Sequence, residues 1–221
     1  MTRVLIVGSN RGIGLEVCRQ LAERGDEVRA ACRKSSLELD EIDGVHVHSG
    51  VDVTDPPSLD SLAESLGRES IDWLVVVAGI LEPVSLADFD AGSVRRQFEV
   101  NALGPLSAAR ALSRCLRAGG RIGLVTSRMG SIADNTSGGS YGYRMSKAAL
   151  NMAGRSLAHD LAGRQIAVQL LHPGWVRTDM TGGTGHIDAS ESAAGLIARL
   201  DELTLETSGT FYHQNGEELP W

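Results

Sequence analysis

Short apolar runs alternate along the chain with segments in which apolar residues recur at helical spacing. The apolar runs, rich in Val, Ile, Leu and Ala, cover residues 4–7, 27–33, 45–53, 71–79, 120–127 and 166–171, with a last edge strand expected at 209–214. Helical spacing marks residues 15–21, 58–66, 94–117, 143–161 and 188–203. Apolar runs bounded by turn residues are typical of strands in a parallel sheet, and the segments between them of amphipathic helices. The pattern therefore predicts an α/β fold, a doubly wound sandwich with a central, mostly parallel sheet.

Size and charge narrow the class of protein. With 221 residues, 42% of them hydrophobic, the chain can bury a sizeable core, and we expect a single domain over residues 1–221. The net charge of −7 includes no basic run, which argues against nucleic acid as a partner. No signal peptide is visible before the first strand and no apolar run reaches membrane-spanning length, so we expect a cytoplasmic protein without a membrane partner.

Cysteine and histidine spacing indicates neither disulfides nor a metal site. Cys18, Cys32 and Cys115 are odd in number and scattered, which predicts reduced, buried thiols. The six histidines show no His-Glu-x-x-His spacing and no Cys/His cluster, so we assign no metal.

The turn between the first strand and the first helix is rich in glycine. Gly8, Gly12 and Gly14 lack a Cβ, so the backbone there can turn tightly and approach a ligand closely. The N–H groups and dipole at a helix N-terminus favour negative charge, and a dinucleotide pyrophosphate fits that description. The alternative is a glycine-rich turn that binds nothing. The predicted cofactor contacts in this turn are Gly8, Ser9, Asn10, Arg11, Gly12, Ile13 and Gly14.

Further motifs follow in order along nearly the whole chain. They are Asp52, Ala78-Gly79, Asn101, Ser127, Tyr143-x-x-x-Lys147 and Pro173-Gly174. With the Gly-x-x-x-Gly-x-Gly turn, this series resembles the short-chain dehydrogenase/reductase family. The resemblance implies a Rossmann-type fold, a nicotinamide cofactor and hydride transfer between a carbonyl and an alcohol. The C-terminal end resembles a subgroup of small reductases that includes carbonyl reductases and the bacterial C-factor signalling protein.

One motif departs from the family pattern. Val76 and Val77 stand where the family usually has two asparagines before Ala78 and Gly79. Those asparagine side chains mainly support the neighbouring backbone, so the departure bears on local rigidity more than on chemistry.

The candidate catalytic residues are Asn101, Ser127, Tyr143 and Lys147. Residues four apart share a helix face, so the Tyr143 phenol and the Lys147 ammonium can converge. A free phenol, with a pKa near 10, is a poor base at neutral pH, and we expect the ammonium and an oxidised nicotinamide to favour the phenolate. The resemblance implies that Tyr143 is the general acid/base and that Lys147 holds the ribose hydroxyls, while Ser127 binds the substrate oxygen.

Asn101 lies within a long apolar helix pattern that also contains Gly104 and Pro105, which suggests a kink. The resemblance implies that the backbone carbonyl of Asn101 holds a water linking Lys147 to solvent. The alternative is a kink that is satisfied internally.

Basic residues favour NADP(H) over NAD(H). Arg33 and Lys34 end the second predicted strand, with no carboxylate until Glu38, and Arg11 lies in the glycine turn. An acidic residue at that strand end would bind the ribose hydroxyls of NAD, whereas Arg accommodates the 2′-phosphate of NADP. The alternative is that these side chains are merely solvated.

The resemblance adds further cofactor contacts. It implies that Asp52, with its neighbour Val53, contacts the adenine, although Asp52 alone also fits a capping or turn role. Ala78 and Gly79 would let the cofactor ribose approach the backbone. The turn expected to wrap the nicotinamide contains Pro173, Gly174, Val176 and Thr178, and a short substrate loop is expected at about 179–188.

These expectations combine into an NADP(H)-dependent oxidoreductase that acts on a small-molecule ketone, aldehyde or alcohol. The alternative function is an NADP(H)-binding regulator or signalling protein without significant turnover. An extended epimerase or dehydratase would need a C-terminal substrate domain, and enoyl reductases space their Tyr and Lys farther apart. Relatives usually form a homodimer or homotetramer through the helices expected at 94–117 and 143–161, and we expect the same here.

Overall fold

The computed structural model describes residues 1–221, and its centre is a seven-stranded sheet in the order β3-β2-β1-β4-β5-β6-β7. Every pair of neighbouring strands is parallel, in agreement with the sequence prediction. The strands are β1 (Arg3–Val7), β2 (Glu27–Ala31), β3 (Val45–His48), β4 (Ile71–Val76), β5 (Leu116–Val125), β6 (Ala167–His172) and β7 (Phe211–His213). The strand order reverses between β1 and β4, and open α/β sheets bind ligands at the carboxyl side of such a switch point.

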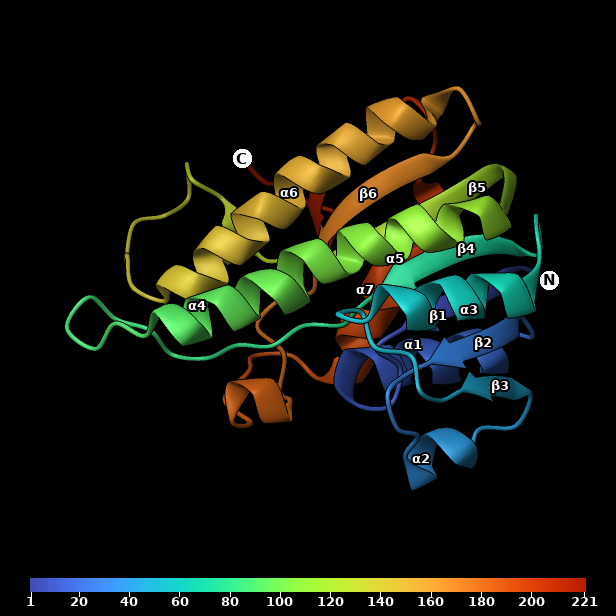
Figure 1. Ribbon diagram of the computed structural model, residues 1–221, viewed down its shortest axis with the longest axis horizontal. Coiled ribbons are helices and arrows are strands. Elements are labelled where there is room, and N and C mark those ends of the chain that lie inside the picture. Colours follow the sequence, from blue (N-terminus) through green and yellow to red (C-terminus); the bar gives the residue numbers. More distant parts are fainter.

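Helices cover both faces of the sheet. They are α1 (Gly12–Glu23), α2 (Leu37–Asp40), α3 (Pro56–Leu66), α4 (Ala91–Phe98), α5 (Gly104–Leu112), α6 (Tyr141–Ala162) and α7 (Ala189–Glu202). A π-helical turn, η1 (Glu99–Leu103), joins α4 to α5, and three short 3-10 turns are η2 (Ser113–Cys115), η3 (Arg128–Gly130) and η4 (Asp179–Thr181). One face carries α3, α5 and α6, and the opposite face carries α1 and α7 (Figure 1). The doubly wound α/β prediction is therefore confirmed.

Strand β1 explains why the sheet strands read as continuous apolar runs. Leu5 and Val7 pack into the core under α3, α5 and α6, whereas Val4 and Ile6 pack into the core under α1 and α7. Successive side chains of a strand point to opposite faces, so a strand between two helix layers needs apolar residues at every position. Each such side chain stabilises the fold by about 1.5–3 kcal/mol relative to its exposed state.

Several element boundaries differ from the sequence prediction. Strand β3 ends at His48 instead of residue 53, because the backbone leaves the extended region at Gly50, where φ is +81°. The helix expected to run to residue 117 ends at Leu112, and β5 begins at Leu116 rather than at residue 120. Apolar residues of helical spacing continue past that helix end, so the pattern alone does not mark it. The four-residue helix α2 was not predicted.

Two smaller observations complete the fold. All three cysteines are buried and none forms a disulfide, as expected. None of the helices combines the length and the apolar character needed to cross a lipid bilayer.

Candidate active site

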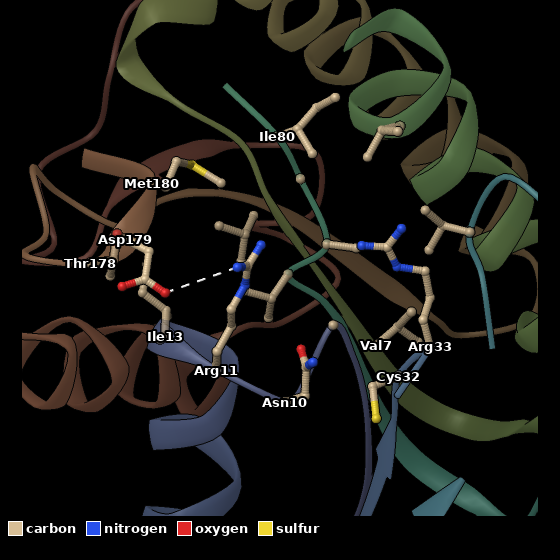
Figure 2. Close-up of a pocket in the computed structure, with 18 of the residues that line it drawn as sticks. Val7, Asn10, Arg11, Ile13, Cys32, Arg33, Ile80, Thr178, Asp179 and Met180 are labelled. Carbon is tan, nitrogen blue, oxygen red and sulfur yellow. Dashed lines mark ion pairs between the residues drawn. The ribbon is translucent and has the colours of Figure 1, made fainter. Parts of the chain in front are cut away.

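A cavity of about 730 Å³ lies at the carboxyl ends of β1, β2 and β4, across the switch point of the sheet (Figure 2). The structure brings most of the predicted site residues to its wall. Those that line it are Gly8, Asn10, Arg11, Gly12, Ile13, Arg33, Lys34, Asp52, Val53, Ala78, Gly79, Tyr143, Lys147, Pro173 and Thr178. Six predicted residues are not part of the wall, namely Ser9, Gly14, Asn101, Ser127, Gly174 and Val176.

Two glycines of the turn after β1 are packed too tightly to carry a side chain. Gly8 has φ +92°, and a Cβ there would lie 2.6 Å from the backbone nitrogen of Ala78. A Cβ on Gly14 would overlap the carbonyl oxygen of Gly8. Helix α1 then begins at Gly12 with neither a side-chain cap nor an acidic residue in its first turn. The positive end of the α1 dipole therefore lies at the cavity. The close approach of the chain after β1 to the chain after β4 depends on the absence of a Cβ at Gly8.

Two arginines extend into the cavity from different sides. Figure 2 shows the guanidinium groups of Arg11, from the glycine turn, and Arg33, from the loop that follows β2. The Arg11 guanidinium lies 3.9 Å from the Asp179 carboxylate, and both side chains are largely exposed. Asn10 joins the two loops, because its Nδ2 donates to the carbonyl of Lys34 at 3.0 Å. The arrangement gives this end of the cavity an excess of positive charge.

Asp52 takes the turn role that the sequence left open. Its Oδ1 accepts hydrogen bonds from the backbone N–H of Thr54 at 2.9 Å and from the Thr54 hydroxyl at 2.8 Å. Burial opposes ionisation, but the hydrogen bonds from Thr54 and the nearby Arg33 charge hold the pKa of Asp52 below its ordinary value. The carboxylate is thus ionised and oriented beside the cavity, and an adenine contact remains a prediction.

Tyr143 and Lys147 lie together in the first two turns of α6. Both are buried, and the Lys147 Nζ lies 5.8 Å from the centre of the Tyr143 ring. The same ammonium donates to the carbonyl oxygen of Val125, at the end of β5, at 2.9 Å. Helix α6 therefore brings the phenol and the ammonium to one wall of the cavity, as the four-residue spacing predicted.

Burial governs the protonation of this pair. It raises the pKa of Tyr143 to about 12, and the hydrogen bond with Ser127 acts in the opposite direction. Burial lowers the pKa of Lys147 to about 8. In the chain alone, desolvation of the phenolate outweighs the effect of Ser127, and the expected contribution of an oxidised nicotinamide stays a prediction. At neutral pH Tyr143 is therefore a neutral phenol with a proton to donate.

Ser127 and Asn101 lie next to residues of the cavity wall without lining the cavity themselves. Ser127 follows β5, and its Oγ accepts a hydrogen bond from the backbone N–H of Met129 at 3.1 Å. Asn101 lies in the π-helical turn η1, fully buried, and its side-chain amide pairs with the backbone of Ile80. The predicted kink is thus a π-helical turn, and such turns frequently occur at functional sites. A water held by the Asn101 carbonyl stays a prediction.

The two valines that replace the family's asparagines are held by the sheet. Val76 is the last residue of β4. The Val77 N–H donates to the carbonyl of Val7 at 2.8 Å, so β1 supports the backbone leading to Ala78 and Gly79.

Sequence reasoning missed Arg177, which organises the loop after β6. Its guanidinium donates to the carbonyls of Gly185 and His186, at 3.1 and 3.0 Å, and to the Asp188 carboxylate at 2.8 Å. Arg177, Asp179 and Met180 also line the cavity. The only signal in the sequence is the position of Arg177 between Val176 and Thr178, within the turn already assigned to the cofactor.

The residues present fit a dinucleotide. The uncapped N-terminus of α1 and the close-packed glycines suit a pyrophosphate, and the Arg11 and Arg33 guanidinium groups suit a further phosphate. Lys147 donates one hydrogen bond to protein, and an ammonium has three donors, so it retains capacity for ribose hydroxyls.

Comparisons with known proteins agree on one family. A family model described as short chain dehydrogenase matches residues 2–187. The 1-hydroxy-2-glutathionyl-2-methyl-3-butene dehydrogenase of Rhodococcus sp. (strain AD45) is 44% identical over 227 aligned residues, covering 100% of both chains. The C-signal protein of Myxococcus xanthus is 49% identical over 154 residues, 68% of this chain and 93% of that protein. The NADPH-bound carbonyl reductase from chicken fatty liver has a TM-score of 0.91 and 28% identity, covering 100% of this chain and 99% of that one.

Proposed function

The chain belongs to the short-chain dehydrogenase family of oxidoreductases, and we propose that it interconverts a ketone or aldehyde and an alcohol with NADP(H), using Tyr143 as general acid and base. The observation that carries the proposal is the buried Tyr143–Lys147 pair on the wall of a cavity whose other wall is the glycine turn. A proton donor and a dinucleotide cradle in one cavity are the two parts that carbonyl reduction requires.

In the direction of reduction, Tyr143 gives its proton to the carbonyl oxygen. The pKa of about 12 keeps the phenol protonated at neutral pH. When bound, the nicotinamide supplies the hydride for reduction and accepts it for oxidation. Ser127, beside the phenol, would donate a hydrogen bond to the same substrate oxygen and stabilise the charge that develops there. Lys147 is mostly protonated at neutral pH, since its pKa is about 8, and its charge stabilises the tyrosinate that remains.

We propose NADP(H) as the preferred cofactor because of the charge at the end of β2. Arg33 and Lys34 line the cavity there, and Arg11 reaches it from the glycine turn. A guanidinium binds a phosphate through two parallel hydrogen bonds, an interaction that NAD(H) does not offer at its ribose. The name of the similar chicken carbonyl reductase structure, with NADPH bound, supports the same choice.

The alternative, a regulator without turnover, is not favoured. A similar protein is named C-signal, but that name bears only on the Myxococcus protein. A sensor needs a dinucleotide cradle and has no use for a buried proton donor. The present chain places Tyr143, Lys147 and Ser127 together, which supports an enzyme.

The test combines nucleotide binding with turnover. NADPH and NADH binding is measured by fluorescence titration, and NADPH oxidation is followed with aldehydes, ketones and quinones. The panel also includes a carbonyl compound bearing a glutathionyl group, because the name of the Rhodococcus relative specifies a glutathionyl alcohol. Wild type is compared with Tyr143→Phe and with Tyr141→Phe, a half-exposed phenol without a lysine four residues later.

We expect Tyr143→Phe to lower kcat about 10²–10⁴-fold while NADPH still binds, because general acid catalysis contributes that much. Tyr141→Phe is expected to remain active. Full activity of Tyr143→Phe, or absence of binding of both nucleotides to the wild type, would contradict the proposal.

A further inference from the structure

The segment after β4 leaves the sheet and is held by helix side chains. Ile80 lines the cavity, on the side away from Asn10 and Cys32 in Figure 2. The Asn101 amide makes both backbone hydrogen bonds of Ile80: its Oδ1 accepts from the N–H and its Nδ2 donates to the carbonyl, each at 2.8 Å. One side chain thus occupies the place that a neighbouring strand would take.

Gln97 repeats this arrangement two residues farther along the segment. Its Oε1 accepts from the backbone N–H of Glu82 and its Nε2 donates to the carbonyl of Glu82, both at 3.1 Å. The Nε2 also donates to the Ser93 hydroxyl at 3.2 Å. Gln97 has no exposed surface, so each of these polar atoms depends on its protein partner.

The two amides match the segment in spacing. Alternate residues of an extended chain present their N–H and C=O groups on one edge, about 6.6–6.8 Å apart. Residues four apart on a helix lie on one face and are separated by about 6 Å along its axis. Gln97, in α4, and Asn101, in η1, are four apart, and Ile80 and Glu82 are two apart, so one side of the helix can bond both residues of the segment.

The same amides contact the helix that carries Tyr143. A Cβ added to Gly142 would lie 2.5 Å from Gln97 Nε2, so the amide packs directly against the first turn of α6. The Asn101 Nδ2 donates to the Ser146 hydroxyl at 3.1 Å, and this hydroxyl donates to the carbonyl of Tyr143 at 2.8 Å. The amides therefore lie between the 80–82 segment and the proton donor.

We propose that Gln97 is a positioning residue for carbonyl reduction. Together with Asn101 it fixes residues 80–82, of which Ile80 lines the cavity, and sets that segment against the α6 turn that carries Tyr143. The inference deepens the proposed function and rests on it. Gln97 contacts neither the glycine turn nor the phenol itself. It therefore acts on the reaction only by fixing the position of residues 80–82.

The test compares one substitution at two buried glutamines. Gln97→Met keeps the length of the side chain and removes its hydrogen bonds. Gln169→Met is the control, because Gln169 is equally buried but lies in β6, and its Oε1 has no hydrogen-bond partner. If Gln97→Met does not fold, Gln97→Asn replaces it, since it keeps the amide but shortens its reach by one methylene. Steady-state kinetics and amide hydrogen exchange are measured for each variant.

We expect Gln97→Met to lower kcat/KM for the carbonyl about tenfold or more, because a small displacement of the reacting groups costs that much. The KM for NADPH should change by less than about twofold, since the dinucleotide cradle is untouched. The Glu82 amide should exchange faster in this variant and not in Gln169→Met. Unchanged exchange at Glu82, or a loss of kcat/KM no greater than in the control, would overturn the proposal.

The exchange measurement separates the two proposals. If the wild type reduces no carbonyl in the panel, the proposed function fails. The placement of residues 80–82 by Gln97 then stands or falls on the exchange of the Glu82 amide alone.

Discussion

The two ends of the cavity are built in different ways. The dinucleotide end, so called after the proposed cofactor, is built around the consecutive residues 8–14, in which Gly8 and Gly14 leave no space for a Cβ. The other end, called the carbonyl end after the proposed function, combines side chains from η1, from the end of β5 and from α6 with a backbone segment that follows β4. The first end depends on glycines that have no Cβ, and the second on hydrogen bonds between elements far apart in the sequence. Substitutions of the packed glycines should therefore act sterically, and substitutions at the carbonyl end through lost polar contacts.

The largest effect that tests this contrast is expected from Gly14→Ala. The new methyl group would overlap the carbonyl oxygen of Gly8, so the turn must open. Forcing one extra carbon into a packed site costs about 1–3 kcal/mol, and we expect thermal stability and affinity for both nucleotides to fall together. Gly163→Ala is the control, because a Cβ at Gly163 meets nothing within 4 Å. Isothermal titration and thermal denaturation measure the two effects, and normal nucleotide binding by Gly14→Ala would contradict the steric account.

A narrower effect, confined to one cofactor and without loss of stability, is expected from Arg33→Gln. Loss of a charged hydrogen bond to phosphate costs about 1.5–3 kcal/mol, which corresponds to a tenfold or greater loss of NADPH affinity. NADH affinity should stay unchanged, because that cofactor has no phosphate at this ribose. Arg19→Gln removes an arginine of α1 that pairs with Glu16, outside the cavity, and serves as the control. Equal losses for NADPH and NADH would mean that Arg33 does not select the cofactor.

The third effect concerns His172, at the end of β6, and is the smallest at neutral pH. It is a dependence of the free energy of unfolding on pH in the acid range. Burial, with contributions from the His213 and Arg128 charges, lowers the pKa of His172 to about 3. The unfolded chain has an ordinary histidine pKa near 6.5, so between pH 6.5 and 3 the unfolded state binds the extra proton. The free energy of unfolding should therefore fall as pH drops through this window, by up to about 1.4 kcal/mol per pH unit.

His172→Gln should flatten this slope, and His46→Gln, at an exposed strand position, should leave it unchanged. Urea denaturation at several pH values between 3 and 7 measures the difference. An equal slope in wild type and His172→Gln would show that other groups control acid unfolding.

The contrast between the two ends also explains what the sequence could predict. The glycine turn and the Tyr143–Lys147 pair are local patterns, whose geometry follows from one βα turn and one helix face. The α/β class follows from the apolar runs of the strands. Gln97, by contrast, reads as an ordinary polar helix residue, because its partner Glu82 lies 15 positions earlier along the chain. The effect of burial on the pKa of Tyr143 was not visible in the sequence for a similar reason, since burial depends on the packing of the whole fold.

The boundaries of α5 and β5 show the same limit at the level of backbone. Leu112, Cys115 and Leu116 keep helical spacing, yet Leu116 pairs with Ile71 as the start of β5. Tertiary pairing with β4 decides where the helix ends, and a pattern of apolar residues contains no information about that pairing.

The π-helical turn η1 changes the direction in which α4 and α5 present their side chains about a continuous helix axis. Helix α4, before the turn, packs on α6, whereas α5, after it, packs on α3. A π-helical turn holds one residue more than an α-helical turn, and one residue corresponds to a rotation of about 100° about the helix axis. The inserted residue lets a single rod present differently oriented stripes to two neighbours. Deletion of one residue there would place α4 and α5 out of phase, and Asn101 would face away from Ile80.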